Sequence, residues 1–511
     1  MSESSIALNR FGLGARAGDA APGDGKRWLL GQFDRYDPRP PTIAAAPSSA
    51  TVAVALVDYY DRQKALRDQY GPRKQLRAAM AQGVAAPPMA MPVPPPMSAP
   101  ENATMTATAP APMPAPLADP FQQARQMANR DARQDYAASV AARMNQSLVT
   151  ETPFVERLVQ FWANHFAVSA DKLEMVALSG SLEFEAIRPH VLGRFADMLN
   201  AVERHPAMLI YLDQAVSVGP NSQVGQRAAA RGQKRVGLNE NLAREIMELH
   251  TLGVRSVYTQ ADVTEFARAM TGWTVAGIGR GPGARLAGQD GAPGSFTFVA
   301  TVHEPGDRTI VGKRYPAGGE AQAQAVLTDL AASAATAQHL ATKLARHFAG
   351  DNPPPAMVAR LKAAYLQSNG DLPTVYRAIV ASPEAWATTP VKFRNPWEWS
   401  VAAYRAMGTR QVQPGAIVGL LNQLGQPTWK PGQPVGWDDI TGSWAGPDAI
   451  MRRVEAAERF AARAPEVDAR ALGAQLFPAA LTPATAQAVA RAESPAQGLA
   501  LLLVSPEMMR R

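Results

Sequence analysis

The sequence predicts a mainly α-helical, multi-helix globular domain with one small antiparallel β-hairpin and a disordered insertion rich in Pro, Ala and Met. Three observations support this fold class. The 511 residues are 46% apolar, which is enough to bury a large core. Residues 121–213 read mostly as helix, with apolar residues recurring at spacings of three and four. A short stretch near 295–315 instead alternates apolar and polar residues, as a β-hairpin does.

The chain divides by composition into two helical parts and one insertion. We expect residues 1–83 to form the N-terminal helical part of the main domain and residues 119–511 to form the rest, with the β-hairpin near 295–315. Residues 84–118 are mostly Pro, Ala and Met, and dense proline prevents both helix and sheet ladders. This segment is therefore expected to be a disordered, low-complexity insertion. Its methionine thioethers suit copper(I), but no histidine or cysteine accompanies them, which favours a linker.

Charge and cysteine content exclude several classes of protein. Lys and Arg exceed Asp and Glu by 51 to 44, and they are scattered along the chain, so we expect no nucleic-acid partner. The chain has no cysteine, which removes disulfides, thiolate zinc sites, iron–sulfur clusters and cysteine nucleophiles. The N-terminus lacks the apolar core of a signal peptide, and no segment is expected to approach a membrane span. We therefore expect a cytoplasmic protein, unless it leaves the cytoplasm bound to an exported partner.

The segment 151–169, ETPFVERLVQFWANHFAVS, has the pattern of an amphipathic helix that starts at Thr152 and Pro153. Its apolar stripe consists of Phe154, Leu158, Phe161, Trp162 and His165. The stripe predicts that His165 points into the interior with the aromatic rings. A buried imidazole needs a hydrogen-bond partner, so His165 is either a satisfied core residue or a ligand.

Residues 239–254, NENLAREIMELHTLGV, combine an apolar stripe with three carboxylates and a histidine. In an α-helix at about 100° per residue, Glu245 and Glu248 share one polar face and His250 lies nearly opposite them. Gly253 is expected in the left-handed conformation that often ends a helix. If the α-helix continues through His250, these three residues cannot hold one metal ion without groups from elsewhere.

A second helix should follow immediately. Thr259 and Asp262 have the spacing of a capping box, in which a threonine cap and an acidic residue satisfy each other's backbone N–H groups. Two helices joined by a short turn form an antiparallel hairpin. Asp262 should therefore lie near the His250 end of the first helix.

Two interpretations of this helical hairpin remain open. Paired carboxylates suit a hard divalent ion or a proton relay, although the usual di-iron, zinc and serine-hydrolase motifs are absent. Alternatively, the glutamates form ion pairs: Glu240 with Arg244 at spacing four, and Glu245 and Glu248 with arginines such as Arg157 or Arg188.

Two loops add candidate residues. The alternating stretch 295–315 contains Pro-Gly-Asp, which we expect to be the hairpin turn, and it carries His303, Glu304 and Asp307. Residues 428–444 contain three tryptophans, which form either an aromatic wall for a sugar or peptide or an anchor for the loop. They are Trp429, Trp437 and Trp444.

Several longer motifs then give a resemblance. They include LNRFGLGAR at 8–16, FWANHF at 161–166, IRPHVLGRFADML at 187–199, GLNENLAREIMELHTLGV at 237–254, KFRNPWEW at 392–399 and SPEMMRR at 505–511. In this order they resemble the bacterial domain-of-unknown-function 1800 family, over nearly the whole chain outside the insertion. Members of that family usually have His-Asp where this chain has His303 and Glu304, which weakens a ligand role for Glu304 but not for His303.

The resemblance implies a partner but no activity. Genes of this family often neighbour those of the domain-of-unknown-function 1501 family, whose members resemble sulfatases and alkaline phosphatases and often look exported. Two function classes follow. The first is a metal-assisted enzyme that uses the Glu/His/Asp cluster of the helical hairpin, with a divalent metal ion as candidate cofactor. The second is a non-catalytic accessory or escort protein for the phosphatase/sulfatase-like partner. The catalytic candidates are Glu245, Glu248, His250 and His165, and the metal candidates are Glu245, Glu248, Asp262 and His303.

Overall fold

The computed structural model describes residues 1–81, 119–232, 237–289, 291–390, 392–464 and 466–511. The expected disordered insertion, 84–118, lies outside the described residues. The described chain forms two compact units. The main unit comprises Met1–Val54 and Ala132–Arg511, and the second unit comprises Ala55–Asp131. All candidate histidines, glutamates and aspartates belong to the main unit.

The main unit is built almost entirely from helices, as the sequence predicts. Before the first strand these are α1 (Glu3–Ile6), α2 (Gly25–Leu30), α3 (Pro41–Ala44), the end of α6 (Pro120–Val149), α7 (Pro153–His165), α8 (Leu173–Ser181), α9 (Phe195–Glu203), α10 (Pro206–Tyr211), α11 (Gln223–Ala230), α12 (Asn241–Glu245) and α13 (Gln260–Met270). After it come α14 (Pro282–Ala287), α15 (Glu320–Ala332), α16 (Ala334–Ala349), α17 (Pro355–Gln367), α18 (Leu372–Ala381), α19 (Pro396–Ala406), α20 (Pro414–Gln423), α21 (Pro447–Ala462), α22 (Ala469–Leu476), α23 (Pro483–Ala490), α24 (Pro495–Leu503) and α25 (Pro506–Met509).

Helix starts follow local chemistry. Many of these helices begin with proline, whose fixed φ suits the first turn and whose missing N–H is not needed there. Thr152 precedes α7 and Pro153 begins it, although the Thr152 side chain accepts no capping hydrogen bond. The capping box expected at Thr259 and Asp262 is present at the start of α13. A second capping box, formed by Asn395 and Glu398, starts α19.

The β-structure differs in part from the sequence prediction. β3 (Arg308–Ile310) and β4 (Lys313–Tyr315) form an antiparallel hairpin, so a hairpin near 295–315 is confirmed. Its turn is at residues 311–312, however, and not at Pro-Gly-Asp. The alternating residues before that motif form β2 (Phe296–Phe298), which pairs with β1 (Trp273–Val275) from much earlier in the chain. The described residues therefore form two small sheets where the sequence predicts a single hairpin, because alternation indicates a strand without identifying its partner.

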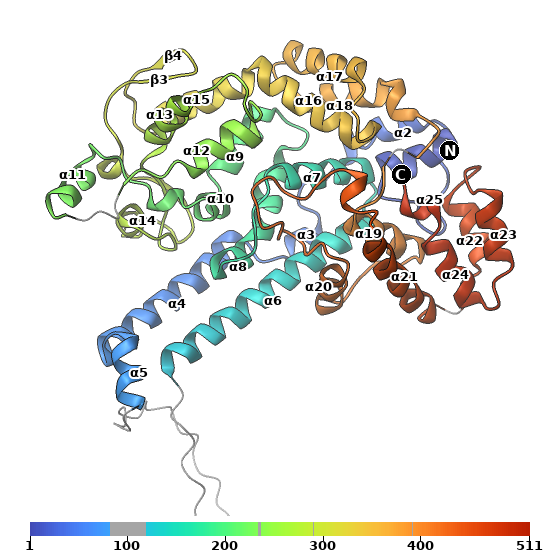
Figure 1. Ribbon diagram of the computed structural model, residues 1–511, viewed down its shortest axis with the longest axis horizontal. Helices are drawn as coiled ribbons and strands as arrows, with labels where there is room; N and C mark the ends of the chain where they lie inside the picture. Colours follow the sequence, from blue (N-terminus) through green and yellow to red (C-terminus); the bar gives the residue numbers. More distant parts are fainter. Residues whose placement is uncertain (82–118, 233–236, 290, 391, 465) are drawn as a thin grey trace, which may run out of the picture. The chain divides into compact units, whose positions relative to one another are not determined.

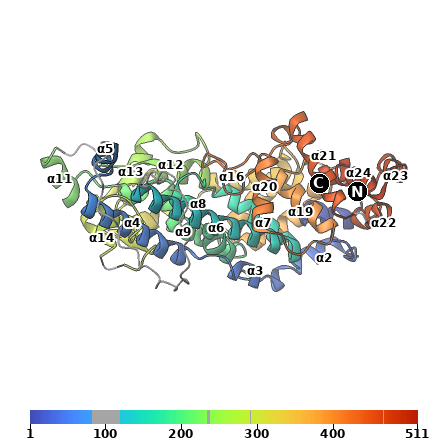
Figure 2. The same ribbon diagram turned by 90° about the horizontal axis from the view of Figure 1, so that it is seen from below.

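A main buried apolar cluster gathers the C-terminal helices around α19. Trp399 and Leu503 are fully buried in it, together with residues of α6, α21 and α24. The two ends of the chain lie close together beside these helices in Figures 1 and 2. Arg394, just before α19, links them by bonding to the carbonyl oxygen of Met508 and the side-chain oxygen of Asn9. This arrangement brings the C-terminal residue, Arg511, into the interior of the main unit.

The second unit is a small helical assembly. It contains most of α4 (Ser49–Tyr70), α5 (Arg73–Ala81) and the start of α6. Its own small core consists of Leu66, Leu76, Phe121 and Ala124. Asp119 forms salt bridges with Arg73 and Arg77, which ties α5 to the residues before α6.

Residues Pro41–Tyr70 are long and apolar enough to cross a membrane by length and composition alone, since one 18-residue window has a mean hydropathy of 1.2. The expectation that no segment spans a membrane stays a prediction. Within the structure the stretch forms two helices, α3 and α4, separated by residues 45–48. Core helices of soluble proteins pass the same test of length and composition, so the stretch does not by itself indicate a span.

Candidate functional site

His165 lies where the apolar stripe of α7 places it. Its side chain is 1% exposed, with the rings of Trp162 and Phe166 packed against it. Its Nε2 atom is 3.1 Å from the carbonyl oxygen of His250, and its Nδ1 atom is 3.0 Å from Nζ of Lys343. Since a carbonyl only accepts, Nε2 carries the proton and Nδ1 accepts from the lysine. Burial, followed by the charge of Lys343, holds the pKa of His165 well below its usual value, so the ring is neutral.

His250 occupies a position that a regular α-helix would not give it. After α12 the chain forms one π-helical turn, η6 (Ile246–His250). Each hydrogen-bonded ring of such a turn contains one more residue than in an α-helix, so residues five apart lie closer to the same face. The expectation that His250 lies nearly opposite Glu245 is therefore wrong for this helix. The His250 ring is fully buried and its Nδ1 atom is 2.8 Å from Oε1 of Glu203, which is also fully buried.

The two glutamates of the hairpin are not bound by the arginines proposed from the sequence. Arg157 pairs with Glu398, and Arg188 pairs with Glu156. Glu248 has Arg244, four residues earlier, at 3.6 Å, and the expected pair of Glu240 with Arg244 is present at 3.1 Å. Glu245 is half-buried and forms no salt bridge within the described part of the chain. Burial raises the pKa of Glu245, an effect that the nearby His250 opposes.

Asp262 and His303 have structural partners of their own. The Asp262 carboxylate completes the capping box of α13 and also accepts from the backbone N–H of Val311, which ties α13 to the β3–β4 hairpin. The Nδ1 atom of His303 lies 2.7 Å from the carbonyl oxygen of Thr271. Glu304 is buried and accepts from the backbone and the side chain of Asn221.

The sequence candidates are therefore only partly brought together. His165 and His250 are neighbours, with ring centroids 6.1 Å apart, and Glu245 is near His250. Among the described residues there is no group of three or more His, Asp or Glu side chains that could hold a metal ion. The residues that complete the histidine cluster are Glu203, His339 and Lys343.

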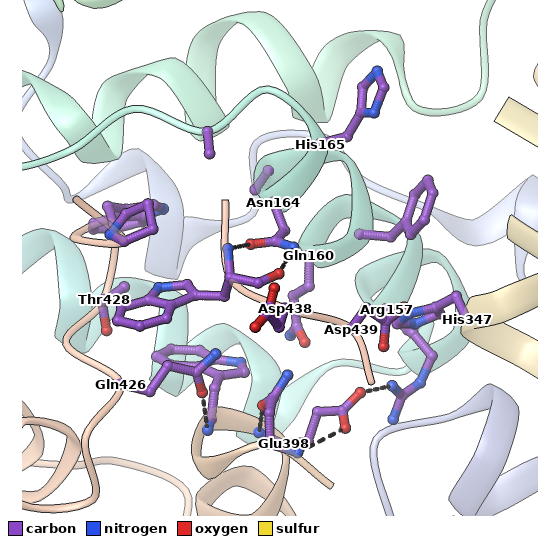
Figure 3. Close-up of a pocket in the computed structure, with 18 of the residues that line it drawn as sticks. Arg157, Gln160, Asn164, His165, His347, Glu398, Gln426, Thr428, Asp438 and Asp439 are labelled. Carbon is purple, nitrogen blue, oxygen red and sulfur yellow. Dashed lines mark hydrogen bonds and ion pairs between the residues drawn. The ribbon is translucent and has the colours of Figure 1, made fainter. Parts of the chain in front are cut away.

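A cavity of about 110 Å³ in the described main unit adjoins the histidine cluster, and His165 and Lys343 belong to its lining. It is formed by Arg143 of α6, residues 157–168 of α7 and its end, residues 343–347 of α16, residues 395–398 at the start of α19, and the segment 426–439. We call it the tryptophan cavity, because Trp397, Trp429 and Trp437 line it. Figure 3 shows Gln426 and Thr428 on one side, and Arg157, His347 and Asp439 on the opposite side.

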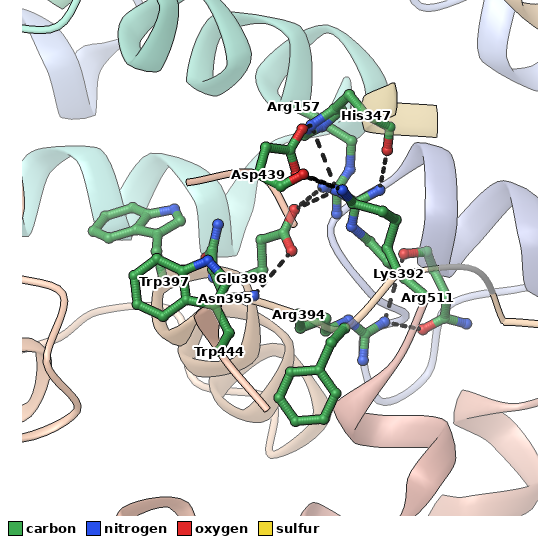
Figure 4. A network of polar contacts seen from close by, with 12 residues as sticks. Arg157, His347, Lys392, Arg394, Asn395, Trp397, Glu398, Asp439, Trp444 and Arg511 are labelled. Carbon is green, nitrogen blue, oxygen red and sulfur yellow. Dashed lines mark hydrogen bonds and ion pairs between the residues drawn. The ribbon is translucent and has the colours of Figure 1, made fainter. Parts of the chain in front are cut away.

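An ionic network forms one wall of this cavity (Figure 4). Glu398 accepts from Arg157 and, at 3.0 Å, from Arg511. Asp439 pairs with Lys392 at 3.0 Å and lies 2.9 Å from Nδ1 of His347. Burial tends to raise the pKa of Glu398, but the two guanidinium groups outweigh it and hold the pKa well below the usual value. The carboxylates of this wall are thus ionised and already neutralised.

His347 presents a free acceptor in the same wall. Because the Asp439 carboxylate accepts from Nδ1, the proton of the neutral ring is on Nδ1 and Nε2 is left as an acceptor. Burial lowers the pKa of His347 to about 4, although Asp439 opposes the shift. The ring is therefore neutral at pH 7 and is a weak proton acceptor.

Five buried polar atoms of the lining have no hydrogen-bond partner among the described residues. They are Nε1 of Trp397, Nε1 of Trp437, Oγ1 of Thr428, Nε of Arg346 and Nε2 of His347. Buried polar groups are nearly always hydrogen-bonded, and leaving one unpaired costs about 1–3 kcal/mol. The residues that line the cavity therefore carry five buried polar groups that are available to a polar molecule.

The tryptophans of the loop 428–444 play two different roles. Trp429 and Trp444 are 8% exposed and belong to the main apolar cluster, so they anchor the loop. Trp429 also donates to Glu183 at 3.0 Å. Trp437 is half-buried and lines the cavity, as Trp429 also does.

Sequence reasoning missed most of this cavity. Besides the tryptophans of 428–444, a local signal was Asn-Pro-x-Glu at 395–398, a capping box whose glutamate also binds two arginines from distant segments. His347, Lys392 and Asp439 lie in unremarkable local contexts. Their proximity results only from the packing of α16 against segments nearer the C-terminus.

The comparisons with known proteins identify a family and nothing more specific. A family model described as a protein of unknown function (DUF1800) matches residues 6–510. No curated protein and no solved structure matches the chain.

Proposed function

We propose that this chain, which belongs to the DUF1800 family, binds a small polar molecule in the tryptophan cavity. The observation that carries the proposal is the set of five buried polar atoms without partners. The indole N–H groups of Trp397 and Trp437 can only donate, whereas Nε2 of the neutral His347 can only accept. A molecule that satisfies them offers both donors and acceptors, as hydroxyl-bearing compounds do.

The size of the cavity limits what is buried. Its volume of about 110 Å³ is smaller than the roughly 150 Å³ of an engineered cavity that holds benzene. The buried part is therefore a head group of a few heavy atoms, and the rest of a larger molecule extends through the opening.

Thermal-shift measurements with a panel of small polar metabolites test this proposal. A compound that binds only the folded protein raises its melting temperature. Trp437→Phe keeps the aromatic wall but removes the N–H, and it should reduce the shift. Trp273→Phe is the matched control, because Nε1 of Trp273 is also buried without a partner but lies outside the cavity. Equal shifts in both variants, or no shift with any compound, would contradict the proposal.

Catalysis at the same cavity is a second candidate function, and Lys343 favours it. Burial lowers the pKa of Lys343 to about 8, with Asp439 opposing the shift and Arg346 adding to it. A lysine with a pKa this close to neutrality is suited to acid–base or nucleophilic chemistry. The metal-assisted reaction expected at the helical hairpin has no ligand set among the described residues. Elemental analysis of the purified protein tests it directly.

The accessory role is also retained as a proposal. Val435 and Ile440, on the loop beside the cavity, are 49% and 41% exposed, and exposed apolar side chains are common at protein contacts. A partner of the domain-of-unknown-function 1501 family could bind there. Copurification of the two proteins, and its loss in Val435→Ser with Ile440→Ser, tests this role. Copurification that is unchanged by the double substitution would exclude this loop as the contact.

A further inference from the structure

Two cations at the tryptophan cavity differ from the other buried charged groups around it. The carboxylates of Glu398 and Asp439 are each held by two basic side chains, and Arg143 is paired with Glu183 at 2.8 Å. Lys343 and Arg346, by contrast, form no ion pair with a carboxylate in the described parts of the chain. Both are half-buried, and both line the cavity.

Lys343 and Arg346 also repel each other. They are three residues apart on α16, so their side chains are neighbours on the helix surface. Like charges at this spacing are destabilising, and partial burial strengthens the repulsion because water screens it less. Nε of Arg346 is, in addition, one of the buried atoms without a partner. Lys343 donates to Nδ1 of His165, but neither cation has a carboxylate partner among the described residues. Two neighbouring cations that cost stability in this way are typical of a binding site.

We propose that the head group bound in the tryptophan cavity carries an oxyanion, a carboxylate or a phosphate, and that Lys343 and Arg346 bind it. This inference rests on the proposed binding function and adds the chemical class of the ligand. An oxyanion relieves the repulsion between the two cations and accepts charge-assisted hydrogen bonds from both. Trp397 and Trp437 supply further N–H donors on the same cavity.

A cationic head group fits less well. The carboxylates that would attract it already accept from Arg157, Arg511, Lys392 and His347. Releasing any of them would leave a buried charge without its partner, which is strongly unfavourable. Asp438 is exposed and accepts from the hydroxyl of Ser443, so it lies at the surface of the site.

Binding should depend on pH through Lys343. The groups that face it are His165 of α7, His339 and Arg346 of α16, and Asp439 of the loop. Both histidines have lowered pKa values, so they are neutral throughout the range from pH 7 to 9. Despite its burial, Asp439 has a pKa that is held low by His347 and Lys392, so Asp439 keeps its charge. Lys343, with a pKa of about 8, is the group that loses its charge in this range. If only charged Lys343 binds the anion, affinity falls by up to about tenfold between pH 7 and pH 9.

The experiment measures binding of acetate, methyl phosphate and a neutral polyol, xylitol, to the full chain by ligand-observed NMR at constant ionic strength in chloride. The variants are Lys343→Gln and Arg346→Gln, and the control is Lys362→Gln, which removes the same charge from α17 outside the cavity. We expect one of the two anions to bind the parent and the control equally. Its affinity should fall at least tenfold in either cavity variant, and Lys343→Gln should abolish the pH dependence. Acetate and methyl phosphate distinguish the two sources of the oxyanion.

The outcomes separate this inference from the proposed function. Binding of xylitol that Trp437→Phe weakens, without binding of either anion, overturns the oxyanion and leaves the binding function intact. No binding of any probe overturns both. Anion binding that is unchanged in Lys343→Gln and Arg346→Gln overturns the assignment of these residues. Arg346→Gln should melt no lower than the parent, since it relieves the repulsion and breaks no side-chain hydrogen bond among the described residues, and a large loss of stability would overturn the argument from charge.

Discussion

Replacing Glu398 with Gln tests whether the ionic wall of the cavity is buried as described. Glu398 is 7% exposed, and its partners Arg157 and Arg511 are each 1% exposed. Glutamine preserves the shape and can still accept from the backbone N–H of Asn395, but it leaves two buried guanidinium groups without their anion. Breaking a buried pair by neutralising one partner costs about 3–5 kcal/mol. Because two cations lose their partner here, we expect the free energy of unfolding to fall by an amount in the upper part of that range. Urea unfolding at pH 7 measures it.

The same substitution has a definite pH signature. The folded-state pKa of Glu398 is held well below the unfolded value of about 4.3. Its contribution to stability is therefore fully present above that value and is lost as the pH falls through the folded pKa. The difference between parent and variant should be constant from pH 6 to 7 and shrink below about pH 4. Glu384→Gln is the control, because its pair with Arg360 is much more exposed and should contribute less than about 1 kcal/mol. Equal losses in the two variants would refute the reasoning.

Three further predictions concern His165, His347 and Glu245. His165→Ala should cost about 2 kcal/mol in unfolding free energy, because it leaves a cavity and deprives Lys343 and the His250 carbonyl of a partner; an unchanged stability would contradict this packing. His165 and His347 have lowered pKa values, so each ring is protonated more readily in the unfolded chain. As the pH falls from 6.5 to 5, each should lower the unfolding free energy by up to about 1.4 kcal/mol per pH unit. Calorimetry that shows no change in stability over this range would exclude their burial as neutral rings. Glu245→Gln should be neutral or stabilising, since burial raises the pKa of Glu245, and a large loss of stability would indicate an ion pair.

The sequence predicts the local parts of this fold well because their causes are local. The capping box of Thr259 and Asp262 involves residues three apart, and it is present in the structure. Gly253 has φ of +92°, as the helix-ending pattern predicts. The burial of His165 follows from a stripe within one helix. In each case the interacting atoms are within about one helical turn, so periodicity and propensity are sufficient.

Partners from distant segments could not be predicted in this way. Alternation at 296–298 correctly indicates a strand, but its partner β1 lies more than twenty residues earlier. The π turn at Ile246–His250 changes the face on which His250 lies, and no residue in that segment signals it by side-chain pattern. Glu203, which binds His250, is 47 residues away. Such pairings depend on how whole helices pack.

The site proposed from the structure differs from the one proposed from the sequence for the same reason. The sequence directs attention to carboxylates that are dense in one segment, Glu245 and Glu248, yet density within a helix mainly reflects a solvated face with its own arginine. The tryptophan cavity instead takes one or two groups from each of several segments, none of them unusual locally. What distinguishes it is a mismatch visible only in three dimensions. The carboxylates of Glu398 and Asp439 are paired with basic side chains, whereas Lys343 and Arg346 have no carboxylate partner among the described residues, and Nε of Arg346 and two indole N–H groups have no acceptor there. A fold stabilised only by its own contacts would have little reason to retain these unpaired donors around one cavity. The pairing of buried polar groups is therefore a better guide to a binding site in this protein than the density of charged residues along the chain.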